Sequence, residues 1–312
     1  MNNNTKKYSE LIKLKAKDLG FNDCKIVKAN EFDLKTISNY KKWIDKGFAA
    51  DMLYMKRNID KRFDITKMVN NAKSLILVAL NYYPNDKQIN KTYKVSKYAY
   101  GNDYHKILKD KLYKLFDYIN SDLKKVSGRV FVDSAPVLEK QWAVRAGLGW
   151  QGKNSCLINK EMGSFFFIGE IVIDLDLVYD KPVNDYCGSC SRCIDACPTG
   201  AIDEPYVVNA NKCISYLTIE HKGDFKNYLN LDFKNYIFGC DICQDVCPWN
   251  NKPVFSKIND FNILDVIKDF KYCDWDNINE QDFNNVFKNS PLKRTGFDGL
   301  KRNINKVKNY KE

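Results

Sequence analysis

The sequence predicts a mixed α/β fold: a large N-terminal domain of alternating helices and strands, a small cysteine-rich module and a short helical C-terminal part. Three observations predict it. The chain has 312 residues, of which 44% are hydrophobic, so about two domains with hydrophobic cores are expected. Helix-like and strand-like hydrophobic patterns alternate over residues 1–180. Eight of the 11 cysteines lie between Cys187 and Cys247.

The elements of the N-terminal domain follow from the spacing of its apolar residues. Helical spacing recurs in four segments: Thr5–Leu19, Thr36–Lys46, Asp103–Val126 and Leu138–Ala146. Short apolar runs predict strands: Cys24–Val27, Ser74–Leu80, Arg129–Asp133 and, as one or two strands, Ser164–Leu177. The run Ser74–Leu80 is apolar almost throughout, which is typical of a strand buried on both faces.

The rest of the chain divides at a linker. Pro182–Tyr186 precedes the cysteines, and helical patterns return after Pro253, around Ile263–Ile267 and Leu300–Val307. We therefore expect an N-terminal α/β domain over residues 1–180, a cysteine module over residues 181–255 and a helical extension over residues 256–312.

Several classes of protein are excluded. No apolar run approaches the roughly 20 residues of a membrane-spanning helix. Met1–Lys7 contains neither a secretion-signal core nor a twin-arginine pair. We expect a cytoplasmic protein with no membrane partner, and disulfides are rare in that compartment, so clustered cysteines indicate metal binding. There is no glycine-rich dinucleotide motif and no Walker A motif.

The cysteine spacing is that of bacterial ferredoxins. The first run, Cys187–Cys197, has the pattern C-x2-C-x2-C-x3-C-P, in which the fourth cysteine ligates the other cluster. The second run, Cys240–Cys247, has three cysteines, and Cys213 can supply the missing thiolate. This crossing rule gives two ligand sets for two [4Fe–4S] clusters: Cys187, Cys190, Cys193 and Cys247 in the first set, and Cys197, Cys213, Cys240 and Cys243 in the second.

Zinc is the alternative, but zinc sites favour separated cysteine pairs, and the triple pattern fits them poorly. The three remaining cysteines are expected to be small core residues: Cys24, Cys156 and Cys273. Two neighbouring clusters conduct electrons, and the large domain before them indicates an enzyme. The His-ligated corrinoid signature Asp-x-His-x-x-Gly is broken, because Leu108 occupies the glycine position.

Seven segments, in family order, resemble epoxyqueuosine reductases of bacterial queuosine synthesis: Ser96–His105, Val132–Glu139, Ala146–Asn154, Gly163–Glu170, the first cysteine run, Cys213–Glu220 and Gly239–Asn250. The resemblance implies a cobalamin bound base-off between the N-terminal domain and the ferredoxin-like module. The clusters would reduce it, and the epoxide of epoxyqueuosine at the tRNA wobble position would become the cyclopentene of queuosine, the final step of synthesis. It also implies a monomer, an external donor of the ferredoxin or flavodoxin type, and a short form without the C-terminal helical repeats.

The resemblance assigns the proton donor to Asp133. A carboxylic acid whose pKa is raised by partial burial can protonate an epoxide oxygen at neutral pH. From the residues alone, a helix cap or loop carboxylate is the simpler interpretation. His105 is expected to be a hydrogen-bonded histidine at a helix start, with no catalytic role.

The resemblance also implies cofactor and RNA contacts. The corrinoid contacts are Arg57, Tyr98, Asp133, Trp150, Gly152, Lys153, Asn154, Ser164, Ser215, Asp241 and Ile242. Gly149 and Gly152 would let the backbone approach the macrocycle, with a glycine-rich surface turn as the alternative. The net charge of +11 suits a tRNA partner, although a lysine-rich surface alone would give it too. The RNA contacts are His221, Lys222, Lys293 and Arg294.

Two alternative functions remain open from the residues. A reductive dehalogenase would share the corrinoid and the paired clusters, but it would carry an export leader. A non-catalytic ferredoxin-type electron carrier would bind neither corrinoid nor RNA.

Overall fold

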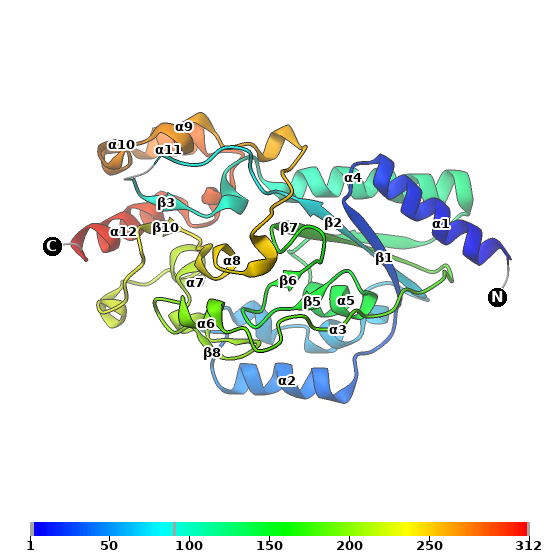
Figure 1. Cartoon of the computed structure of the whole chain (residues 1–312). Helices are drawn as coiled ribbons and strands as arrows, with labels where there is room; N and C mark the ends of the chain where they lie inside the picture. Colours follow the sequence, from blue (N-terminus) through cyan, green and yellow to red (C-terminus); the bar gives the residue numbers. More distant parts are fainter. Residues whose placement is uncertain (1–2, 90–91, 311–312) are drawn as a thin grey trace.

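The computed structural model describes residues 3–89 and 92–310 and is built on one four-stranded sheet with helices on both faces (Figure 1). The strand order is β1-β2-β7-β4, and each neighbouring pair is antiparallel. The strands are β1 (Asp23–Lys28), β2 (Ser74–Asn81), β4 (Gly128–Phe131) and β7 (Phe166–Ile173). All eight residues of β2 are buried, which confirms the predicted doubly buried strand.

The two faces of the sheet carry separate cores. On one face, α1 (Asn3–Asp18) and α4 (Tyr104–Tyr118) pack against the strands, with Leu108 and Leu112 fully buried. On the other face, α5 (Glu139–Ala146) packs through Trp142 and Ala143. The predicted helix Asp103–Val126 is too long, because α4 ends at Tyr118 and a π-helical turn follows over Ile119–Leu123.

The remaining elements are mostly short. The other helices are α2 (Leu34–Asp45), α3 (Ile59–Phe63), α6 (Arg192–Asp195), α7 (Ile214–Ile219), α8 (Ile242–Asp245), α9 (Asp265–Asp269), α10 (Tyr272–Asn277), α11 (Glu280–Val286) and α12 (Gly296–Asn309). The other strands form pairs: β3 (Lys94–Val95) with β10 (Tyr236–Phe238), β5 (Trp150–Gln151) with β6 (Leu157–Ile158), and β8 (Ile202–Glu204) with β9 (Val207–Val208).

A third core joins distant parts of the chain. It contains buried residues from the segments 93–100, 210–238 and 263–307, with Trp275 fully enclosed. Asn303 of α12 donates from Nδ2 to the carbonyls of Thr218 and Ile237, 2.8 Å from each. The expected helical extension is therefore packed against the cysteine module and against β3 (Figure 1).

Two further sequence predictions concern exposure. Cys24 is buried in the main core, as predicted, but Cys273 is exposed. The core prediction for Cys273 is wrong because α10 turns Trp275 inward instead. Within residues 3–89 and 92–310, every helix is too short or too polar to span a bilayer.

Candidate active site

The two cysteine runs lie side by side because α6 and α8, which follow their first cysteines, pack against each other. Burial raises the pKa of the Cys247 and Cys240 thiols, and the charges of neighbouring thiols raise it further. These neighbours are Cys187 and Cys190 for Cys247, and Cys213 and Cys197 for Cys240. The two ligand sets of the crossing rule stay a prediction. In the described part of the chain, no three His, Cys, Asp or Glu side chains converge on a single-ion site.

Two expected corrinoid contacts lie against the first cysteine set instead. Trp150 is buried with its ring centroid 4.9 Å from that of Trp249, in one apolar cluster with Cys187 and Cys247. Lys153 donates from Nζ to the carbonyls of Gly188 (2.7 Å) and Cys190 (2.9 Å). The structure therefore uses both side chains to hold the loop that carries the first thiols.

Residues around the second set hold the cysteine loop to the sheet domain. Asn154 donates from Nδ2 to the carbonyl of Cys243, at 3.2 Å. Cys156 is partly buried, and the neighbouring Cys243 thiol lowers the pKa of its thiol to about 7, an interaction that the core prediction for Cys156 missed.

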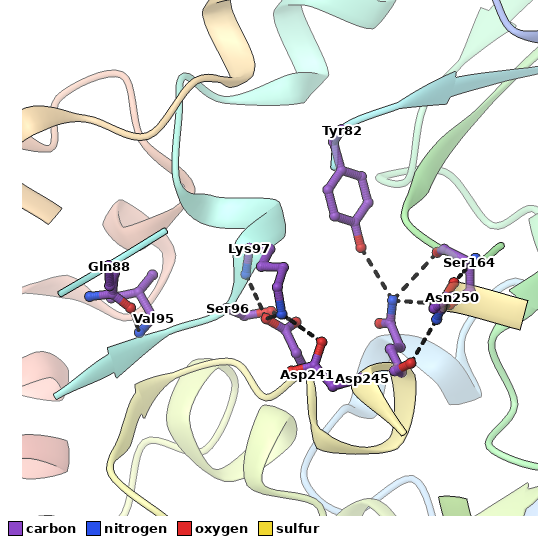
Figure 2. Close-up of polar contacts among 10 residues, drawn as sticks. Tyr82, Gln88, Val95, Ser96, Lys97, Ser164, Asp241, Asp245 and Asn250 are labelled. Carbon is purple, nitrogen blue, oxygen red and sulfur yellow. Dashed lines mark hydrogen bonds and ion pairs between the residues drawn. The ribbon is translucent and has the colours of Figure 1, made fainter. Parts of the chain in front are cut away.

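Asp241, expected at the corrinoid, is buried in a polar clamp (Figure 2). Its carboxylate accepts hydrogen bonds from the hydroxyl of Ser96 and from the backbone N–H of Lys97, at 2.8 Å for the latter. The Lys97 ammonium lies 2.6 Å from Asp245 and 3.4 Å from Asp241. These contacts join α8 to the segment before α4, so the Asp241 carboxylate is occupied by protein partners.

Ser164 makes a second junction with α8 (Figure 2). Its hydroxyl accepts hydrogen bonds from Asn250 Nδ2 at 3.0 Å and from Gln244 Nε2 at 3.3 Å. The glycines nearby serve packing: a Cβ on Gly149 would clash with the carbonyl oxygen of Ile158, and one on Gly152 would lie 2.6 Å from the Ile158 side chain. In this structure the two glycines allow close packing within the β5–β6 pair, whereas the sequence predicted that they allow a macrocycle to approach the backbone.

Asp133 lies in the loop between β4 and α5, two residues beyond the end of the strand that was predicted to contain it. Its Oδ2 accepts a hydrogen bond from the Tyr104 hydroxyl at 2.7 Å and lies 3.2 Å from His105 Nε2. The other ring nitrogen of His105, Nδ1, lies 2.7 Å from Asp103 Oδ1. Tyr104 stacks on Phe167 with centroids 4.1 Å apart, which fixes its hydroxyl. These residues form the acid centre: Asp103, Tyr104, His105 and Asp133.

The charges of the acid centre differ from the sequence expectation. Burial raises the pKa of Asp133, but the hydrogen bonds from His105 and Tyr104 outweigh it, so that pKa is lowered. The expected raised pKa is therefore wrong for this state of the protein. Burial also opposes the imidazolium, yet the carboxylates of Asp103 and Asp133 raise the pKa of His105 to about 9. At neutral pH the centre holds a carboxylate beside an imidazolium.

Tyr98 connects the acid centre to the cysteine module. Its ring lies 6.4 Å from that of Tyr104 and 6.1 Å from that of Phe238 on β10. Burial, followed by the charges of Asp133 and Asp241, raises the pKa of its hydroxyl. Tyr98 therefore lies between the two halves of the predicted site. Arg57 is exposed after a 3-10 turn, and its carbonyl accepts a hydrogen bond from Arg62.

The expected RNA contacts divide into buried and exposed groups. The His221 ring is buried, with Nε2 3.0 Å from the carbonyl of Asp224, so the predicted RNA contact of this ring is wrong. Lys222 and Lys293 are exposed. Arg294 donates to both carboxylate oxygens of Glu220, at 3.0 and 2.9 Å. The hydrogen bonds to Glu220 raise the pKa of Arg294, and the negative charge of Asp133 adds a smaller effect in the same direction.

Comparison with known proteins identifies the family. Residues 62–134 match the family model described as epoxyqueuosine reductase QueG, and residues 186–250 match a 4Fe–4S double cluster binding domain. An epoxyqueuosine reductase of Leadbetterella byssophila is 50% identical over 301 residues, which cover 96% of this chain and 98% of the relative. One from Cellulophaga algicola is 48% identical over 312 residues, covering 98% and 100%.

The chain belongs to the epoxyqueuosine reductase family.

Solved structures of epoxyqueuosine reductases have the same fold. One, crystallised with an epoxyqueuosine-modified tRNA-Tyr stem loop, gives a TM-score of 0.90 at 27% identity and covers 96% of this chain and 80% of that chain. A selenomethionine-labelled epoxyqueuosine reductase gives 0.89 at 27% identity. The predicted family, fold class and oxidoreductase activity are confirmed, and the dehalogenase and electron-carrier alternatives are set aside. The double-cluster match favours iron–sulfur clusters over zinc.

Sequence reasoning missed several members of the acid centre and its surroundings. Tyr104, His105, Glu139 and Glu170 all lie in segments that resemble epoxyqueuosine reductases. Their positions relative to Asp133 depend on pairing between distant strands and on the packing of α4 and α5. The sequence contained one hint: each of these residues is the last or next-to-last residue of a segment that resembles epoxyqueuosine reductases.

Proposed function

We propose that this epoxyqueuosine reductase acts on epoxyqueuosine in tRNA, with cobalamin and two [4Fe–4S] clusters as cofactors and Asp133 as the proton donor. The observation that carries the proposal is the acid centre, in which Tyr104 and His105 both hold Asp133 Oδ2. Tyr98 links this centre to the loops of the second cysteine set. Proton delivery and electron delivery would thus meet at one place.

The two thiol sets suit two [4Fe–4S] clusters, since each set supplies four cysteines. We assign Cys187, Cys190, Cys193 and Cys247 to the first cluster and Cys197, Cys213, Cys240 and Cys243 to the second. The loop of the first set, residues 187–196, is partly exposed, whereas Cys243 is packed against Asn154 and Cys156. An external donor of the ferredoxin or flavodoxin type would therefore deliver electrons to the first cluster.

The histidines of the chain already have partners within the protein. The chain has two histidines, and every ring nitrogen of His105 and His221 has a protein partner within 3.4 Å. Residues other than these histidines would therefore hold a cobalamin. Tyr98, Ser215 and Ile242 lie where the two halves meet and are the contacts that we retain. When bound, cobalamin supplies the low-potential reductant for the epoxide carbon.

Residues of the chain would supply the proton that the epoxide oxygen takes up. Tyr104 and His105 orient the Asp133 carboxyl, which is 56% exposed and would be covered by bound cofactor and substrate. Loss of water would raise its pKa and favour the protonated form that the epoxide oxygen needs. A Bacillus subtilis epoxyqueuosine reductase has been crystallised with its catalytic aspartate loop swung out of the active site, which supports a movable donor loop.

The RNA would bind beside the acid centre. A related reductase was crystallised with a modified tRNA stem loop, and Lys222, Lys293 and Arg294 lie on the side where the charge of Asp133 acts on Arg294. Exposed cations there can contact backbone phosphates. We propose that the protein works in the cytoplasm as a monomer.

The test is anaerobic turnover of epoxyqueuosine-containing tRNA by protein reconstituted with iron, sulfide and cobalamin. Asp133→Ala should slow queuosine formation by about a hundredfold or more, because a general acid is lost, while iron content stays unchanged. Cys273→Ser, at an exposed thiol, is the matched control and should retain full activity. Undiminished turnover by the Asp133 variant would remove Asp133 as the donor.

A further inference from the structure

Two glutamates lie behind the Asp133 loop, and neither has a role in the mechanism so far. Glu139 is the first residue of α5, and Glu170 lies in the middle of β7. Glu170 is fully buried, and neither of its carboxyl oxygens has a hydrogen-bond partner in the described part of the chain. A charged carboxylate in such a place is strongly disfavoured, and burial raises the pKa of Glu170, so Glu170 is held in the neutral form.

Glu139 is in direct contact with the donor residue. The backbone N–H of Asp133 donates to Glu139 Oε1. Asp133 has a φ of +54°, in the left-handed region that few non-glycine residues adopt, and this hydrogen bond fixes the peptide in that conformation. The Glu139 carboxyl thus lies immediately behind the residue whose own carboxyl faces Tyr104 and His105.

The two carboxyls differ in their ability to keep a proton. Asp133 is stabilised as a carboxylate, mainly by His105 and Tyr104. For Glu139, burial and then the negative charge of Asp133 raise the pKa to about 8, against weaker opposite effects of the hydrogen bond from the Asp133 N–H and of the charges of Lys140 and His105. Burial and the charges of Glu139 and Asp133 raise the pKa of Glu170 further. At neutral pH Glu139 therefore keeps a proton behind the Asp133 backbone, on the side away from the hydrogen bonds that Tyr104 and His105 make to the Asp133 carboxylate.

We propose that Glu139 stores the proton that Asp133 delivers to the epoxide oxygen. This inference rests on the proposed function. Converting the epoxide to an alkene takes two electrons, supplied through the clusters by the external donor, and two protons; both C–O bonds break and the oxygen leaves as water. Asp133 gives its proton to the oxygen, Glu139 reloads Asp133 through water, and Glu139 recovers a proton from solvent. The second proton follows the same route.

The first test is Glu139→Gln, which keeps a hydrogen-bond acceptor for the Asp133 N–H but cannot carry the stored proton. We expect about a tenfold loss of kcat at pH 8 and less than about a threefold loss at pH 6, where solvent protons reload Asp133. The alkaline limb of the pH–rate profile should move to lower pH. An unchanged profile would overturn the proposal, because a purely structural role would lower the rate equally at all pH values.

The second test uses a spectroscopic signal and needs no Glu139 variant. In the reconstituted protein, infrared titration should show a protonated carboxyl band that is lost with a midpoint near pH 8. Glu170→Gln preserves the shape of the other buried acid and should leave this band and the pH–rate profile unchanged. If Glu170→Gln removes the band, the store is Glu170 and the proposal fails. Failure of the proposed function would instead show as full turnover by the Asp133→Ala protein.

Discussion

Replacing His105 by asparagine should remove a stability contribution that depends on pH. The two carboxylates that flank the ring raise the pKa of His105 from 6.5 to about 9, despite burial. A raised pKa stabilises the folded state fully below pH 6.5, and that stabilisation is lost as the pH rises through about 9. The full shift corresponds to at most about 3 kcal/mol. Because 33% of the side chain is exposed, solvent screening reduces it to about 1 kcal/mol.

The assay is urea unfolding of the wild-type and His105→Asn proteins under anaerobic conditions at pH 6 and pH 10. The difference in free energy of unfolding between the two proteins should shrink by about 1 kcal/mol from pH 6 to pH 10. Tyr104→Phe is the control: its hydroxyl bond to Asp133 is lost at every pH, since burial and Asp133 hold the pKa of Tyr104 well above 10. A His105→Asn difference that stays constant with pH would refute the assigned imidazolium.

Three other outcomes are expected. Gly147→Ala should lower the free energy of unfolding by about 3 kcal/mol, because φ is +77° and the new Cβ would clash with the carbonyl oxygen of Lys181. Gly47→Ala, at φ +70° with no atom within 4 Å of the new Cβ, should lower it by only about 1 kcal/mol. Cys213→Ser should reduce the iron bound per chain, measured colorimetrically, from about eight to about four, and Cys273→Ser should not change it. Arg294→Ala should weaken RNA binding in fluorescence anisotropy and lower the slope of log affinity against log salt by about 1, and an unchanged slope would exclude a phosphate contact there.

Local sequence patterns were enough to predict part of the fold. The run Ser74–Leu80 specified its buried strand because every residue in it suits a doubly covered position. The direction of the strands could not be predicted, since alternation of helices and strands does not say which strands pair. β7 lies between β2 and β4, and both pairings are antiparallel contacts between residues far apart in sequence.

In the site, too, features set by neighbouring residues in the sequence were predictable, and contacts between distant segments were not. Cysteine spacing is local, so the sequence alone predicts two ligand sets. His105 was expected to be only a helix-start histidine, and its contact with Asp103 two residues earlier fits that expectation. Its contact with Asp133 depends on how α4 packs on the sheet. His221 was expected at the RNA because of the family resemblance, but its ring is buried, which no local pattern reveals.

The third core also has a consequence for the order of assembly during translation. α12 contacts α7 and β10, which flank the second cysteine set, and its Asn303 ties both to the C-terminal helix. Because α12 is synthesised after every proposed ligand, all eight cysteines are translated before α12 can pack against α7 and β10. At 5–20 residues per second, the interval between Cys247 and Val307 is roughly 3–12 seconds. During that interval the elements that flank the second cysteine set lack the helix that packs against them in the folded chain.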